Sequence, residues 1–197
     1  MTTARRRFTR DELEGFRDTT VPDLVGDDLR LLFVGINPGL WTAATQTHFA
    51  HPGNRFYPAL LRGGVISAPI NPAAGMNEQE RRHLTALGIG ITNIADRATA
   101  RAAELTRDEL REGACHLTEK VARWRPRVVA IAGVTAYRVA FDRRRATTGP
   151  QDETLAGAQL WIVPNPSGLN AHETITSLAA AYRRVAKAAG IAVLGDN

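Results

Sequence analysis

Leu31–Gly39 reads LLFVGINPG, and Leu160–Gly168 reads LWIVPNPSG. Each stretch is an apolar run typical of a buried strand, and each ends at an Asn-Pro pair followed by glycine. Proline removes a backbone donor and favours extended geometry in the residue before it, whereas glycine permits a sharp turn. Each segment therefore predicts a buried strand that ends in a rigid polar loop. If both strands are parallel in one sheet, Asn37 and Asn165 lie at the edge where open α/β sheets bind ligands.

The rest of the chain alternates between strand-like and helix-like segments. We expect strands at 29–36, 88–94, 127–132 and 160–163, and helices at 11–17, 54–62, 77–87, 106–124, 135–141 and 173–189. Residues 37–52, 67–76, 96–103 and 143–151 are predicted to be loops, and residues 1–9 a mobile basic tail. This alternation predicts an α/β fold, a three-layer α/β/α sandwich with a short, mostly parallel central sheet. The length of 197 residues suits a single domain, 1–197.

The positive charge of this chain is carried almost entirely by arginine. The formal net charge is +5, and lysine occurs only at positions 120 and 187. Arginine binds phosphate through a forked pair of donors, which favours an anionic partner and, above all, nucleic acid. A compositional bias without any partner is the alternative that the charge alone leaves open.

Several classes of protein are disfavoured by what the sequence lacks. It contains no phosphate-binding GxxxxGK[ST] loop, no dinucleotide-binding GxGxxG after a strand and no GxSxG, and its histidines do not have zinc-site spacing. We therefore expect no metal and no organic cofactor. The single cysteine, Cys115, fits a reducing compartment, and no apolar run approaches the roughly 18–20 residues that span a bilayer. The expected location is cytoplasmic, away from the membrane.

Three ordered motifs are more specific than any one residue. GINPGL at 35–40, FAHPGNRF at 49–56 and NPSGLN at 165–170 together closely resemble the mismatch-specific uracil-DNA glycosylases and their thymine-DNA glycosylase relatives. The resemblance extends over roughly residues 29–189 and includes GITNIADRAT at 90–99 and VVAIAG at 128–133. It implies an enzyme that flips a base out of duplex DNA and hydrolyses its N-glycosidic bond.

The resemblance also implies roles for the residues around the flipped base. Asn37 would position the attacking water, Phe49 would stack on the pyrimidine, and Asn165 would hold the base or its nucleotide. Backbone amides around Ile36 and Thr42 would bind the base edge. Each side chain has an ordinary structural alternative, because an asparagine before proline often closes a turn and Phe49 could anchor its loop on the core.

A second group of residues would contact the duplex. Gly168 and Leu169 would enter the base stack in place of the flipped base, although Leu169 could instead be a buried cap of the last helix. The DNA backbone would be contacted by Arg55, Ser167 and Asn170. Some relatives carry an arginine that helps to hold the opposite guanine at the position of Ala171, so recognition of the opposite base is an open question.

Two further site residues follow from the chemistry of the strand ends. Gly39 leaves space beside the flipped base, so a substituent at pyrimidine C5 could be tolerated. Asp96 lies just past the strand at 88–94, where a carboxylate could stabilise the positive charge that develops on the sugar. The structural alternative for Asp96 is a pair with Arg97 or a brace within the loop.

Together these features predict a monofunctional DNA glycosylase that acts as a monomer on uracil in duplex DNA, with G·U as the expected substrate. Two alternatives remain open. One is a non-catalytic module that binds flipped or damaged bases, and the other is an enzyme that acts on free nucleosides. The arginine content and Leu169 argue against the latter, because a free nucleoside needs no wedge.

Overall fold

The computed structural model describes residues 8–170 and 172–195 and contains a five-stranded sheet in the order β2-β1-β3-β5-β4. Four strands are parallel: β1 (Leu31–Gly35), β2 (Ile89–Asn93), β3 (Val128–Ala132) and β5 (Ala158–Val163). Strand β4 (Gly149–Leu155) is antiparallel to β5 at the edge of the sheet. The predicted α/β fold with a short, mostly parallel sheet is confirmed.

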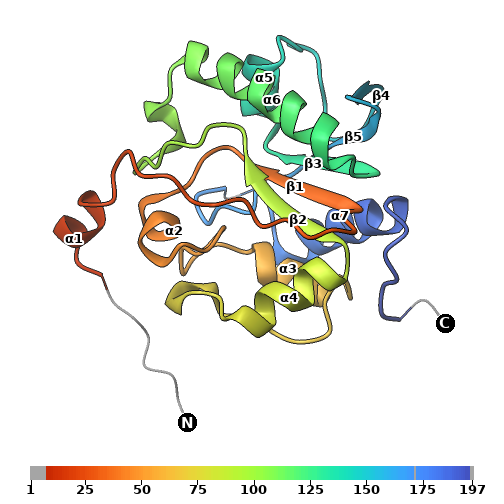
Figure 1. Ribbon diagram of the computed structural model, residues 1–197, viewed down its shortest axis with the longest axis horizontal. Helices are drawn as coiled ribbons and strands as arrows, with labels where there is room; N and C mark the ends of the chain where they lie inside the picture. Colours follow the sequence, from red (N-terminus) through yellow and green to blue (C-terminus); the bar gives the residue numbers. More distant parts are fainter. Residues whose placement is uncertain (1–7, 171, 196–197) are drawn as a thin grey trace.

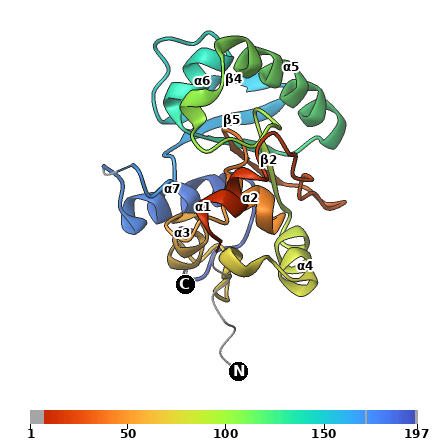
Figure 2. The ribbon, with the colours of Figure 1, turned by 90° about the vertical axis from the view of Figure 1, so that its left-hand side faces the viewer.

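Helices cover both faces of the sheet (Figures 1 and 2). Helices α3 (Phe56–Arg62), α4 (Glu78–Ala86) and α7 (Ile175–Ala188) lie on one face, and α5 (Arg107–Trp124) and α6 (Val134–Ala140) lie on the other. The strands supply both cores by alternation: Leu31 and Phe33 pack with α3 and α7, whereas Leu32 and Val34 pack with α5. This double burial explains why β1 reads as a continuous apolar run.

The short elements lie at one end of the sheet: α1 (Arg10–Glu14), α2 (Leu40–Thr45), and the single 3₁₀ turns η1 (Pro72–Ala74) and η2 (Ala102–Glu104). Helix α2 falls in a segment that we predicted to be loop, because six residues are too few to show a helical period. Strand β4 begins inside the predicted basic loop 143–151. Its sequence, GPQDETL, carries no apolar run, since an edge strand exposes every second side chain to solvent.

The ordered chain begins earlier than the predicted tail allows. Phe8 packs edge-on against Trp41, with ring centroids 5.0 Å apart, and Thr9 caps α1 in a capping box with Glu12. Residues 8 and 9 therefore belong to the folded part, and the remainder of the predicted tail, residues 1–7, lies outside the described residues. Within the described part of the chain, no helix is both long and apolar enough to cross a membrane.

We predict that Gly113→Ala destabilises the protein, although alanine is normally favoured over glycine inside a helix by about 1 kcal/mol. A Cβ at Gly113 would fall inside the contact distance of the Ile94 carbonyl, where α5 crosses the end of β2. A backbone carbonyl cannot move aside, so we expect a loss of about 1–3 kcal/mol in the free energy of unfolding, measured by urea titration.

The exposed neighbour provides the control for this substitution. Glu112→Ala lies on the same turn of α5 and should change the free energy of unfolding by less than about 0.5 kcal/mol. A higher unfolding midpoint for Gly113→Ala than for the unsubstituted protein would show that α5 is not fixed against β2 at this point.

Candidate active site

The parallel register brings four strand ends to the same level. Gly35 at the end of β1 pairs with Asn93 at the end of β2, and Ala132 at the end of β3 pairs with Val163 at the end of β5. We call this end of the sheet the site edge. Both Asn-Pro loops follow strands that end there, as the sequence predicted.

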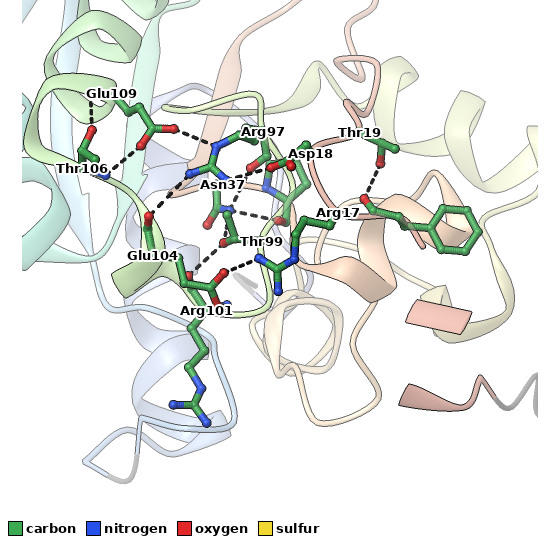
Figure 3. Close-up of polar contacts among 12 residues, drawn as sticks. Arg17, Asp18, Thr19, Asn37, Arg97, Thr99, Arg101, Glu104, Thr106 and Glu109 are labelled. Atoms are coloured by element: carbon green, nitrogen blue, oxygen red, sulfur yellow. Dashed lines mark hydrogen bonds and ion pairs between the residues drawn. The ribbon is translucent and has the colours of Figure 1, made fainter. Parts of the chain in front are cut away.

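The side-chain amide of Asn37 is held in one orientation. Its Nδ2 donates to the carbonyls of Pro38 and Arg97, each at 3.0 Å, and to Thr99 Oγ1 at 2.8 Å (Figure 3). Carbonyl oxygens only accept, and the Thr99 hydroxyl donates its proton to the Arg101 carbonyl at 2.9 Å. The amide nitrogen is therefore fixed, and Asn37 Oδ1, which has no hydrogen bond within the described residues, is left to accept one from a ligand.

Arg97 fixes the loop that carries these acceptors. Its guanidinium donates to Asp18 at 2.8 Å and to Glu109 at 2.7 Å, while its carbonyl accepts from Asn37 (Figure 3). The hydrogen bond from Arg97, with a second one from the Thr106 backbone, lowers the pKa of Glu109 to about 2. The pair therefore stays charged across the physiological range of pH.

The segment before Thr20 closes over the same loop. The Asp18 backbone N–H donates to the Ala98 carbonyl at 2.9 Å, and the Ala98 N–H donates to the Thr19 carbonyl at 2.9 Å. Arg17 forms an ion pair with Glu104 at the far end of the loop. The acceptors of the Asn37 amide are thus held from two sides, by α5 and by the chain that follows α1 (Figure 3).

Asp96 points to a different set of partners. Its carboxylate lies 3.2 Å from Lys120 Nζ, which also pairs with Asp23 at 3.1 Å. Arg97, the alternative partner that the sequence suggested, pairs with Asp18 and Glu109 instead. The electrostatic role of Asp96 stays a prediction, and its pairing favours the brace within the loop.

Asn93 is a site residue that the sequence analysis did not single out. It is buried at the end of β2, and its Nδ2 lies 3.3 Å from His48 Nδ1. His48 Nε2 contacts the Pro22 carbonyl at 3.0 Å, so Nε2 carries the proton and Nδ1 accepts from Asn93. Asn93 Oδ1 then lies over Gly35, where a Cβ would collide with it. The sequence did offer a signal for Asn93, because the strand GITN ends in asparagine. Asn93 pairs with Gly35 at the end of β1.

The expected base-stacking side chain lies beside this amide. A Cβ built on Gly35 would lie 3.4 Å from the Phe49 ring, so the ring is next to the end of β1. The backbone of Phe49 is left-handed, with a φ of 55°. One face of its ring stacks on Phe56, with centroids 4.2 Å apart. Phe49 is therefore anchored to the core, as in the structural alternative, and remains half-buried at the site edge.

Backbone donors from the start of α2 face the same region. Gly39 is the N-cap of α2, and Thr42 is its third residue. Gly39 also pairs with Thr99 in a parallel bridge, which joins the start of α2 to the neighbouring loop. The first backbone N–H groups of a helix have no partner inside it, and those of Trp41 and Thr42 have none elsewhere among the described residues. A Cβ built on Gly39 would meet nothing within 4 Å, which agrees with the open space expected there. Ile36 instead uses its carbonyl to accept from Ala95, at 2.9 Å.

The loop that carries Leu169 is held by Arg55. The guanidinium donates to the carbonyls of Ser167 at 2.6 Å and Asn170 at 2.7 Å, and also to that of Glu173. Arg55 therefore braces this loop, in place of the phosphate contact that we expected from the sequence. The braced loop presents Leu169 with 90% of its side chain exposed, which excludes the alternative of a buried helix cap.

Gly168 brings the two motif loops into contact. A Cβ at Gly168 would lie 2.6 Å from the Gly53 carbonyl, so only glycine fits without a shift. Asn165 Oδ1 accepts from the Ser167 N–H at 3.0 Å, which is the turn-closing role that the sequence left open. Its Nδ2 faces Gly133 and remains available as a donor. Ala171, the position tied to opposite-base recognition, lies outside the described residues.

Two hollows of about 670 Å³ each meet at the site edge. The first, which we call the Asn165 groove, brings together five predicted site residues: Ile36, Asn165, Ser167, Leu169 and Asn170. The second, the Gly39 pocket, is lined by Gly39, Trp41 and His51 and by α1. The segment Ala100 to Ala103 borders both hollows, directly after Thr99. The other predicted site residues line neither hollow: Asn37, Thr42, Phe49, Arg55, Asp96 and Gly168.

The fold is that of an α/β protein with polar loops at the carboxyl ends of its parallel strands, which is the edge where open α/β sheets bind ligands. The family model of the uracil DNA glycosylase superfamily matches residues 22–186. The chain therefore belongs to the uracil DNA glycosylase superfamily, and this membership indicates a DNA glycosylase.

A solved structure shares the fold. It is the solution NMR structure of a candidate uracil DNA glycosylase from Methanosarcina acetivorans, which is 17% identical to this chain with a TM-score of 0.56. The match covers 85% of this chain and 98% of that one. At this level of identity the likeness concerns the fold alone.

The buried His48 predicts a dependence of stability on pH. Burial lowers the pKa of His48, and the hydrogen bond to Pro22 offsets this only in part. The unfolded chain then binds the proton first, below about pH 6.5, so the free energy of unfolding should rise with pH through the window below that value and level off above it. One proton contributes at most about 1.4 kcal/mol per pH unit.

Urea unfolding at several pH values, with His48→Gln as the comparison, measures this contribution. Glutamine keeps a polar side chain but cannot take up a proton, so the variant should show a smaller rise between acidic and neutral pH. Identical pH dependence in the two proteins would mean that His48 is not buried as a neutral side chain.

Proposed function

We propose that this protein is a monofunctional uracil-DNA glycosylase of the mismatch-specific kind, acting as a cytoplasmic monomer on uracil opposite guanine in duplex DNA. The proposal needs no metal and no organic cofactor. The observation that carries it is the fixed amide of Asn37, whose Nδ2 contacts three acceptor oxygens while Oδ1 has no hydrogen bond among the described residues. An amide oxygen in that state can accept a hydrogen bond from water and orient it.

The chemistry is a hydrolysis. The C1′–N1 bond breaks, its electron pair leaves with the base, and water oxygen forms the new bond to C1′. Asn37 orients the water but does not ionise, so the water proton passes to the departing base or to solvent. In this proposal, backbone N–H groups at the start of α2 stabilise the negative charge that builds on the base.

Asn93 supports uracil as the base. Because its Nδ2 is engaged by His48, it presents an oxygen beside Phe49. An oxygen accepts the N3–H of uracil or thymine, whereas the N3 of cytosine has no proton to give. The open space at Gly39 would admit a C5 substituent, so some tolerance of thymine is part of the proposal.

Leu169 supports a duplex as the substrate. Leu169 is a large apolar residue that is 90% exposed on a braced loop beside the Asn165 groove, so it is free to enter a base stack. Filling the gap that an extruded nucleotide leaves in a base stack offsets part of the few kcal/mol that unstacking costs.

Asn37→Ala is predicted to abolish most uracil excision and to leave duplex affinity nearly unchanged. A group that activates or orients the reacting water is typically worth about 10²–10⁴ in rate. The measurement is single-turnover release of uracil from a labelled G·U duplex, read as strand scission after alkali. Asn71→Ala is the matched control, because Asn71 also precedes a proline but lies in the η1 turn.

The same assay separates this function from the alternatives. A gel shift without scission by the unsubstituted protein would identify a non-catalytic binder, and activity on free deoxyuridine would identify a nucleoside hydrolase. Excision by Asn37→Ala within about threefold of the unsubstituted rate, well below the expected effect, would remove Asn37 from the mechanism.

Thr99→Val is predicted to slow excision by a factor of about 2 to 10, the equivalent of one hydrogen bond of about 0.5–1.5 kcal/mol. Valine fills the same buried space but cannot accept from Asn37 Nδ2, so the amide loses one of its three anchors. Thr99→Ser keeps the hydroxyl and should restore the rate. If the valine and serine variants are equally fast, Thr99 does not orient Asn37.

A further inference from the structure

A groove of about 450 Å³ between α5 and α6 is lined mainly by arginine. Its four arginines are Arg107, Arg111, Arg138 and Arg144, and Asp142 is the single acid in its lining. We call it the arginine groove. Its two helices, α5 and α6, form the upper layer in Figure 2, which views the molecule from the side of α1 and α2.

The charge of this groove is poorly compensated. Arg107 has no polar partner among the described residues, and Arg111 meets Asp108 only at 3.4 Å, with both side chains exposed. Arg144 lies 3.8 Å from Asp142, again at the surface. Exposed pairs of this kind contribute little and leave the guanidinium groups accessible. The groove therefore keeps a positive potential that attracts anions.

The placement of Arg107 is not explained by protein stability, whereas Arg138 braces a loop and still keeps one donor. Arg107 is the first residue of α5, where the positive end of the helix dipole disfavours a cation. Arg138 is fixed in advance, because its Nε and Nη2 both donate to the Ala146 carbonyl, at 2.9 and 2.7 Å. Its Nη1 has no hydrogen bond within the described residues and remains able to donate.

The arginine groove adjoins the Asn165 groove. Thr135, the second residue of α6, lines both. The Asn165 groove also contains Leu169, the proposed wedge. A DNA strand opened at Leu169 can therefore extend from the Asn165 groove into the arginine groove.

We propose that the arginine groove binds a backbone phosphate of the DNA duplex beside the flipped nucleotide, with Arg107 and Arg138 as the principal donors. Guanidinium donors match phosphate oxygens. Arg107 is exposed and free to bind one, and the half-buried Arg138 can add its Nη1. This inference rests on the proposed function for its substrate. It assigns the phosphate contact to residues other than Arg55, whose guanidinium holds the Leu169 loop.

The test is the salt dependence of binding to a duplex with a tetrahydrofuran abasic-site analogue opposite guanine. Affinities are measured by fluorescence anisotropy between about 50 and 200 mM salt, for the unsubstituted protein, Arg107→Gln and the double variant Arg107→Gln/Arg138→Gln. Each lost phosphate contact should lower the slope of log K against log salt by about 0.9. We expect a change of about 0.9 for the single variant and about 1.8 for the double variant.

Arg62→Gln is the matched control. Arg62 is exposed in the last turn of α3, on the opposite layer, and its loss changes the net charge by the same single unit. Its slope should equal that of the unsubstituted protein. If Arg107→Gln shifts the slope no more than Arg62→Gln does, the groove holds no DNA phosphate, and an acidic protein segment becomes the occupant to test.

Neutral methylphosphonate linkages locate the contact. Each phosphate is replaced in turn. The affinity of the unsubstituted protein should fall when one or two linkages near the abasic site are replaced. At one of these linkages, replacement should leave the affinity of Arg107→Gln unchanged. If each replacement lowers the affinity of both proteins by the same factor, the groove is not the phosphate site. If the slope and linkage results hold but uracil is not released from a G·U duplex, the groove stands and the proposed catalytic function fails.

Discussion

The common level of four parallel strand ends is the constraint on which the site depends. Because β1, β2, β3 and β5 end together, three asparagines that are far apart in the sequence meet at one edge, and each is then fixed by a different neighbour. Asn37 is oriented by Thr99 and the carbonyls of its loop, Asn93 by a buried histidine, and Asn165 by the turn that follows it. The sheet brings the amides together, and local hydrogen bonds decide which atom each one offers.

Fixed amides suit a reaction in which the protein supplies orientation rather than an ionising group. An asparagine that rotated freely would spend part of its time presenting nitrogen where oxygen is needed. In this protein the orientation of the Asn37 amide is fixed in advance, because the carbonyl oxygens that contact its nitrogen can only accept hydrogen bonds. The amide therefore does not have to reorient during the proposed reaction. The ion pairs of Arg97 extend this rigidity outward, since they connect the loop that holds the Asn37 amide to α5 and to Asp18.

The sequence predicted the features that depend on local pattern. Apolar runs gave the four parallel strands, and the Asn-Pro pairs gave the loops at their ends. The features that it missed depend on distant partners. Nothing near Arg55 indicates that its donors turn to carbonyls more than 110 positions away, and nothing near Arg97 indicates that it joins two separate segments. Strand β4 was missed because an edge strand needs no apolar run, and Asn93 because its importance depends on His48 and on the bare backbone of Gly35.

The chain before β1 has a consequence for how the protein can be handled. From the sequence alone, residues 8–20 look dispensable, because they contribute only one short helix. In three dimensions Asp18 and Thr19 form part of the frame around the carbonyls that orient Asn37. A shortened protein that starts at Val21 would keep every motif residue and the buried side chains of Val21, Leu24 and Leu29. It would nevertheless lose Asp18 and Thr19, whose hydrogen bonds hold the loop that orients the Asn37 amide. A low activity of such a protein would therefore reflect the missing segment and not the motif residues.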